Sequence, residues 1–171
     1  MSQILQKLKG GDLRSIGRAD EVVEDILKNP SLFGEVFKGM SHDDPKVRMR
    51  SADALEKVSS KHPEYLQPYK KRLISEVSVS DQQEVQWHVA QMFSYLKLTR
   101  KEREKVVSIL FSYIDGTKSN IVKVFSMETL TELAESDDNL KPRVIGKIKK
   151  EIKSGSSAVV NRGRKLIKLL E

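Results

Sequence analysis

This chain of 171 residues contains no cysteine and no long hydrophobic run. Without cysteine it can form no disulfide, thiolate metal site or iron–sulfur cluster, and it has no cysteine nucleophile. The longest apolar stretches, such as Ile109-Leu110-Phe111, fall far short of the ~20 residues that a membrane-spanning helix needs. The first residues also lack the apolar segment and cleavage site of a secretory signal. We therefore expect a cytoplasmic protein with no membrane span.

Glycine and proline are scarce, with nine and five residues, and aromatic side chains make up only 6% of the chain. No window alternates polar and apolar residues with a period of two, so strands are not expected. Hydrophobic residues make up 38% of the chain and charged residues 32%, a balance that excludes disorder. These features predict one folded, all-α domain that spans residues 1–171.

The net charge of +7 is unevenly distributed. Residues 139–171 contain ten lysine and arginine residues against two glutamates, whereas the first 138 residues are nearly neutral. The excess positive charge therefore lies at the C-terminal end of the chain. Such an asymmetry indicates an anionic partner for that end.

A repeat of 37–38 residues is the strongest signal in the sequence. Three segments place apolar residues in matching columns, at the spacing of one helix face, and a second helix recurs with the same period. The apolar columns of the first and second helices share one period. This agreement predicts helical hairpins that bury their apolar faces against neighbouring repeats. The first-helix columns are Val47/Val85/Val122, Met49/Trp87/Val124, Ala52/Ala90/Met127, Leu55/Phe93/Leu130 and Val58/Leu96/Leu133, and the second-helix columns are Tyr69/Val106/Val144, Leu73/Leu110/Ile148 and Val77/Ile114/Ile152.

Capping and turn residues delimit the predicted helices. Asp44-Pro45 is typical of an N-cap followed by proline at the first helical position, and Ser119 occupies the matching column. Thr99 and Glu102 fit a capping box. The predicted organisation is an N-terminal capping pair over 13–41 (helices 13–28 and 31–41), repeats over 45–78 (45–60, 64–78), 82–114 (82–96, 100–114) and 119–153 (119–135, 140–153), and a terminal helix over 157–170.

The first of these repeats opens with Asp44-Pro45-Lys46-Val47-Arg48, followed by Ala52, Ala54 and Leu55, and the later repeats match it more loosely through Val85 with Ala90 and Val122 with Leu130. This pattern resembles that of the HEAT-repeat family, and the resemblance covers about residues 44–170. It implies a right-handed α-solenoid, a HEAT- or armadillo-like superhelix of about four hairpins plus a C-terminal helix, with the second helix of each hairpin on the concave face. HEAT repeats serve as scaffolds, adaptors and transport receptors, and only rarely as enzymes.

The residues that could carry catalysis have simpler structural interpretations. His42 lies in a turn beside two aspartates, His62 precedes a proline in another turn, and His88 lies at the edge of the apolar stripe, where a satisfied or solvent-facing imidazole is expected. None has a serine or glutamate partner spaced as in a catalytic triad. Trp87, the only tryptophan, occupies a core-like column. Adjacent carboxylates are expected to cap helices, so we predict no enzyme, no cofactor and no metal site.

One enzymatic alternative comes from the resemblance alone. Some DNA glycosylases that act on alkylated bases are built from HEAT-like repeats, with an aspartate and aromatic residues in the concave channel. No such set can be matched here, and no residue is carried over. The sequence predicts instead a non-enzymatic protein-interaction or scaffold module.

The candidate binding site is the basic C-terminal end. A protein partner with an acidic surface is the first interpretation, and lysines that merely keep an exposed face soluble would look the same. Nucleic-acid binding through the phosphate backbone is the alternative. No small-molecule substrate is evident. The candidate residues, named below as the basic C-terminal surface, are Lys141, Arg143, Lys147, Lys150, Lys153, Arg162, Arg164, Lys165 and Lys168.

Overall fold

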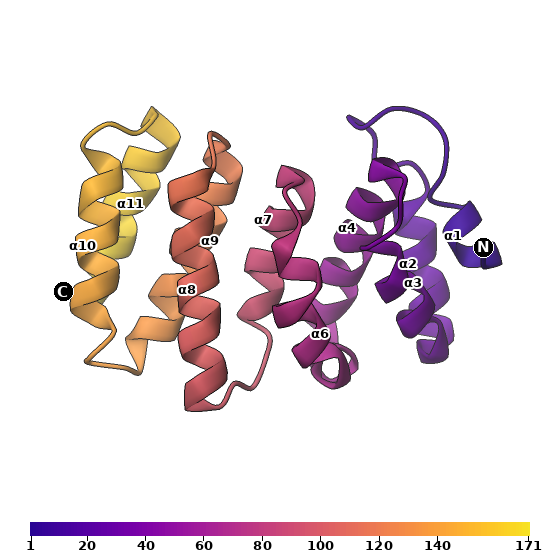
Figure 1. The fold of residues 1–171 in the computed structure, drawn as a ribbon, viewed down its shortest axis with the longest axis horizontal. Coiled ribbons are helices and arrows are strands. Elements are labelled where there is room, and N and C mark those ends of the chain that lie inside the picture. The colour runs from indigo at the N-terminus through magenta and orange to yellow at the C-terminus, as the bar shows by residue number, and fades with distance from the viewer. The chain divides into compact units, whose positions relative to one another are not determined.

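The computed structural model describes residues 1–171, and it is all-helical, as predicted (Figure 1). The chain divides into two compact units, residues 1–97 and residues 98–171. A single repeat domain over the whole chain stays a prediction. None of the helices combines the length and the apolarity needed to cross a lipid bilayer.

The first unit is built around α4, which contacts α2, α3, α5 and α7. The stretch that directly follows α4, expected as the second helix of the repeat, is not one continuous helix but alternates between α-helical and 3₁₀ turns. The elements of this unit are α1 (Gln3–Gln6), α2 (Ala19–Lys28), η1 (Pro30–Leu32), α3 (Phe33–Gly39), α4 (Pro45–Lys61), α5 (Pro63–Leu66), η2 (Gln67–Tyr69), α6 (Lys70–Ser75), η3 (Val77–Val79) and α7 (Gln83–Phe93).

The second unit has α9 at its centre, in contact with α8, α10 and α11. α10 also packs against α11 at Gly163, where a Cβ atom would lie 2.6 Å from Cγ2 of Ile152. A larger residue at this position would force the two helices apart. The elements of this unit are α8 (Arg100–Gly116), α9 (Asn120–Glu135), α10 (Lys141–Ile152) and α11 (Ser157–Leu170).

The predicted apolar columns form the core. Most of their members are buried, including Val47, Val85 and Val122, which are 0% exposed. These column residues therefore face the core, although the second-helix residues of the first repeat, Tyr69, Leu73 and Val77, are spread over η2, α6 and η3 instead of one helix. The column members that are only half-buried are Tyr69, Trp87, Val124, Leu133 and Ile152.

The predicted caps are confirmed. The side chain of Asp44 accepts a hydrogen bond from the backbone N–H of Lys46 at 2.9 Å, and Pro45 is the first residue of α4. Ser119 caps α9 in the same way, and Thr99 and Glu102 form a complete capping box at α8. These caps satisfy backbone donors that the first helical turn leaves without partners.

Two predicted helix boundaries are wrong. The α-helix expected over 64–78 is interrupted around Pro68, which has no N–H to donate to an α-helical hydrogen bond. The helix expected over 13–28 begins only at Ala19. Residues 10–18 instead form a turn-rich loop in which Gly10, Gly11 and Gly17 have positive φ.

This N-terminal loop is organised by a buried arginine, Arg50 of α4, which is 1% exposed. Its guanidinium donates hydrogen bonds to five backbone carbonyls and to no carboxylate. Because the loop carbonyls turn inward to the cation, the chain cannot continue as a helix through this stretch. The acceptors are Leu8 (2.8 Å), Lys9 (3.2 Å), Gly10 (2.6 Å), Asp12 (3.0 Å) and Ser15 (3.0 Å).

Close packing against Arg50 explains Gly17. Its φ is +55°, and a Cβ atom there would lie 2.9 Å from the Cζ atom of Arg50. A side chain at this position would therefore be strained by backbone conformation and by contact at once. Arg50 occupies the same column of the repeat as His88, at the edge of the apolar stripe, and this column does not indicate such a role.

We expect Arg50→Met to open the N-terminal loop. Methionine fills much of the volume but offers no donor to the five carbonyls, so the free energy of unfolding should fall by about 2–4 kcal/mol. Urea denaturation measures this loss. Thermolysin should cleave the variant faster near Leu13 and Ile16, which lie in the loop. Arg14→Met, an exposed change in the same loop, should behave like the unmodified protein; equal loop cleavage in both variants would contradict the role given to Arg50.

Candidate interaction surface

The nine residues of the basic C-terminal surface lie on two helices of the second unit. Lys141, Arg143, Lys147 and Lys150 belong to α10, and Lys153 follows its last turn. The other four, which are Arg162, Arg164, Lys165 and Lys168, belong to α11. α10 and α11 each bury one side in the contact with α9 and with each other.

The exposed face of α10 carries only cations. Its single acidic residue, Glu151, is 9% exposed and forms an ion pair of 2.6 Å with Lys123 of α9. Arg143, Lys149 and Lys150 are exposed. Because this acid is buried, α10 itself contributes no acidic side chain to its outer surface.

Side chains of α8 neutralise part of this charge. Arg143 reaches Glu104 at 3.3 Å, and Lys147 forms a short ion pair with Asp115. Both cations also lie over the ring of Phe111, 5.8 Å and 5.7 Å from its centroid. The hydrogen bond from Lys147 lowers the pKa of Asp115. These two cations are therefore held in place before any partner binds.

Other pairs reduce the charge further. Lys141 pairs with Asp138 at 2.9 Å, and Arg162 pairs with Glu128 at 2.5 Å. Lys149, which the sequence analysis did not include, pairs with Glu171 at 3.3 Å. The members of the basic C-terminal surface that have no carboxylate partner are Lys150, Lys153, Arg164, Lys165 and Lys168.

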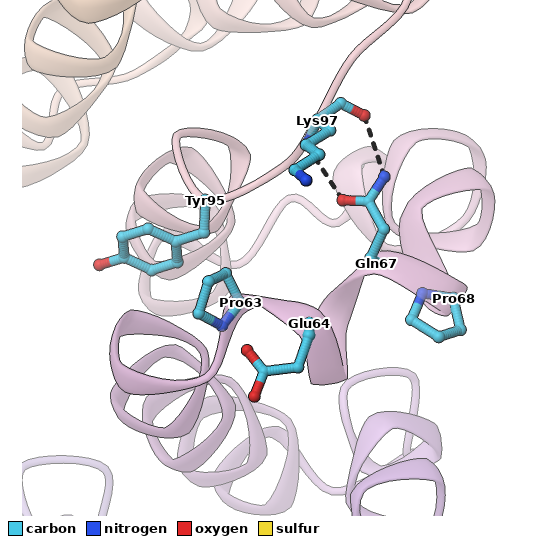
Figure 2. A pocket seen from close by; sticks show the side chains of 6 residues that line it. All are labelled: Pro63, Glu64, Gln67, Pro68, Tyr95 and Lys97. Carbon is cyan, nitrogen blue, oxygen red and sulfur yellow. Dashed lines mark hydrogen bonds between the residues drawn. The ribbon is translucent and has the colours of Figure 1, made fainter.

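A separate cleft lies in the first unit, between the segment that follows α4 and the segment that follows α7 (Figure 2). It has a volume of about 640 Å³ and is lined by Pro63, Glu64, Gln67, Pro68, Tyr95 and Lys97. The amide of Gln67 spans the backbone of Lys97, accepting from its N–H and donating to its carbonyl, both at 3.0 Å. The Tyr95 hydroxyl donates to Glu56 at 2.6 Å. Proline and tyrosine rings offer apolar contact here, and the cleft contains no serine, cysteine or histidine nucleophile.

His42 and His62 lie in turns, as predicted. Nδ1 of His42 accepts a hydrogen bond from the backbone N–H of Asp44 at 2.9 Å. Nδ1 of His62 lies 3.0 Å from the carboxylate of Glu64, and its ring stacks on Tyr65. Nowhere in the structure do three histidine or acidic side chains converge as ligands for a metal ion.

His88 departs from its prediction. It is neither solvent-facing nor fully hydrogen-bonded, since it is 8% exposed and its Nδ1 atom has no partner. Nε2 lies 3.8 Å from Asp53, whose carboxylate is already 2.8 Å from Lys57. Burial lowers the pKa of His88 to about 4, with Lys57 acting in the same direction and Asp53 against it.

Trp87 also departs from its prediction, because its side chain is half-buried and does not fill the core. Its column lies at the edge of the buried helix face. The smaller Met49 is buried there, and Val124 is half-buried like Trp87. A residue of indole size therefore extends beyond the core, with its ring 5.7 Å from that of His88.

No protein-family model, curated protein or solved structure matches the chain. Interpretation of the site therefore depends on its own geometry. That geometry offers a positive helix face on α10, a second group of cations on α11 and an apolar cleft in the other unit. None of these places a nucleophile, a base and an oxyanion donor together.

We expect the stability of the protein to fall as the pH decreases from about 6.5 to 4. The folded state holds His88 neutral, whereas the unfolded chain takes up its proton near pH 6.5, so acid favours unfolding in this window. The full loss is about 3 kcal/mol at 1.4 kcal/mol per pKa unit. Urea unfolding across this range should show a shallower dependence in His88→Gln. His62→Gln, an exposed change, should keep the original slope; equal slopes in all three proteins would contradict the assignment.

Proposed function

We propose that this chain is a non-enzymatic, cytoplasmic protein-interaction module of the HEAT-repeat type. In this proposal the hairpins form a right-handed α-solenoid, and the second helices present the binding surface. The observation that carries the proposal is the outer face of α10, whose own exposed charged side chains are all cations; Lys150 there, and Lys153 just after the helix, have no carboxylate partner. A face of this kind favours a partner with an acidic surface.

Two further observations support the repeat architecture. Helices that the sequence assigns to successive repeats contact each other within each unit: α4 contacts α2 and α7, and α9 contacts α11. The matched columns of these helices are buried, so each repeat hides its apolar face against a neighbour. Neighbouring contacts of this type leave the second helices free to carry polar and charged side chains.

Affinity capture from a cell extract at physiological salt tests the proposal. We expect the full chain to retain proteins with acidic surfaces, and Lys150→Glu/Lys153→Glu to lose them because the reversed charges repel the same partner. Lys165→Glu/Lys168→Glu is the control, since it changes the same number of charges on α11 instead of α10. Retention of no protein, or of the same proteins by all three forms, would count against an interaction module that uses α10.

Nucleic-acid binding is the second candidate, favoured by the five cations that have no carboxylate partner on α10 and α11. Filter binding of duplex DNA over a series of salt concentrations tests it. Each phosphate contact should steepen the log–log dependence of affinity on salt by about 0.9. Replacing Lys165 and Lys168 by alanine should then reduce the slope by about 1.8, or about 0.9 for each lost phosphate contact. Affinity that is already weak at low salt and does not change with salt would exclude this candidate.

A further inference from the structure

We propose that an acidic helical segment of a partner protein lies across α10 and contacts its backbone directly at Gly146. This inference rests on the proposed function, because it assumes that the partner is a protein. It adds the point of closest approach and the chemistry of the segment that binds there.

Gly146 is the only glycine in the chain that the fold itself does not explain. Glycine in a helix interior is less favourable than alanine, so it needs a reason. At Gly146 the backbone is helical and a Cβ atom would meet nothing within 4 Å. The other eight glycines have positive φ (Gly10, Gly11, Gly17), close contacts that exclude a Cβ atom (Gly34, Gly39, Gly155, Gly163) or a position at a helix end (Gly116).

Cations surround this glycine on the surface of α10. Residues three and four positions away are neighbours on a helix face, and three of those four around Gly146 are Arg143, Lys149 and Lys150. Arg143 and Lys149 make only long contacts with carboxylates, at 3.3 Å, and Lys150 makes none. A partner carboxylate can therefore reach each of them while the partner backbone lies over Gly146.

A protein helix fits this surface better than a phosphate backbone does. Glu104 and Asp115 are fixed beside the cations, and they would repel a chain that carries a negative charge at every unit. A helix presents carboxylates only every three or four residues, so it can direct them to Lys149 and Lys150 and place small or apolar residues elsewhere. Phe111, half-buried beneath Arg143 and Lys147, offers an apolar contact on the same side.

The missing side chain matters because helices approach most closely where small residues meet. A methyl group at residue 146 would project into open space in the free protein and into the partner in the complex. The substitution Gly146→Ala should therefore have opposite effects on folding and on binding. If the glycine had a purely structural role, the substitution would not stabilise the fold and weaken binding at the same time.

The experiment begins with a displayed library of random 16-residue peptides, selected against the full chain at about 150 mM salt. We expect the enriched sequences to carry carboxylates at helical spacing. Fluorescence anisotropy then measures the affinity of one selected peptide for each variant. Gly146→Ala should weaken binding about fivefold to tenfold while it raises the Tm by about 2–4 °C.

Charge variants locate the contact. Lys150→Glu should weaken binding of the selected peptide by at least about tenfold, because it replaces an attraction by a repulsion of the same carboxylate. Lys165→Glu on α11 is the matched control and should stay within about twofold of the unmodified protein. Gly116→Ala, at the end of α8, is the control for adding a methyl group to a helix.

The possible failures are distinguishable. A higher Tm with unchanged affinity in Gly146→Ala would overturn the inference alone, as would enriched peptides without carboxylates. An equal loss of binding in Lys150→Glu and Lys165→Glu would show diffuse attraction and overturn it as well. If no peptide is enriched, the proposed function fails together with the inference. Duplex DNA bound by the same protein in that case would assign the cations to nucleic acid.

Discussion

The architecture of the first unit depends on the burial of α4 on nearly all of its sides. Four neighbouring helices contact it, and its buried residues include Arg50, Ser51, Asp53 and Ser59 as well as the apolar columns. Buried polar groups need partners, and a helix that is covered on all sides cannot obtain them from water. The rest of the unit brings such partners to the two charged groups, Arg50 and Asp53, whereas the hydroxyls of Ser51 and Ser59 have none. The N-terminal loop supplies five carbonyls to Arg50, and Lys57 links Asp53 to Asp20 of α2 through two contacts of 2.8 Å.

In the second unit the need of a buried polar group for a partner separates the acidic residue of α10 from its cations. Glu151 faces inward and is satisfied by Lys123, so α10 has no acidic side chain left on its outer face. The close contact of Gly163 with α10 brings α11 against this helix. The positive face of α10 is thus a consequence of how the core is satisfied. It does not require that every lysine in the C-terminal segment act together.

The sequence was sufficient for features that recur or act locally. The period, the buried columns and the caps at Asp44, Thr99 and Ser119 depend on spacing within one helix or on repetition of the same spacing. The role of Arg50 could not be read in this way, because its acceptors lie 35–42 residues away and the columns treat its position as variable. The burial of His88 and Trp87 could not be read from the sequence either. Their positions in the repeat columns do not say how far one large side chain extends beyond the core. Only the three glycines with positive φ, Gly10, Gly11 and Gly17, could have indicated that the N-terminal stretch is a loop.

Ion pairing within the fold reduces the positive charge that the C-terminal segment can offer to a partner. The C-terminal segment has a large positive excess in the sequence, yet four of the nine predicted residues are already paired with carboxylates in the fold. Fixed negative groups among the cations weaken attraction for any anion but penalise most strongly a ligand of uniform charge. For the protein partner that we propose, such an arrangement would favour selectivity over affinity, because the partner would have to place its carboxylates at Lys149 and Lys150 and avoid Glu104 and Asp115. A helix with intermittent charge would meet this condition, and the exposed backbone at Gly146 would then set how closely that helix lies.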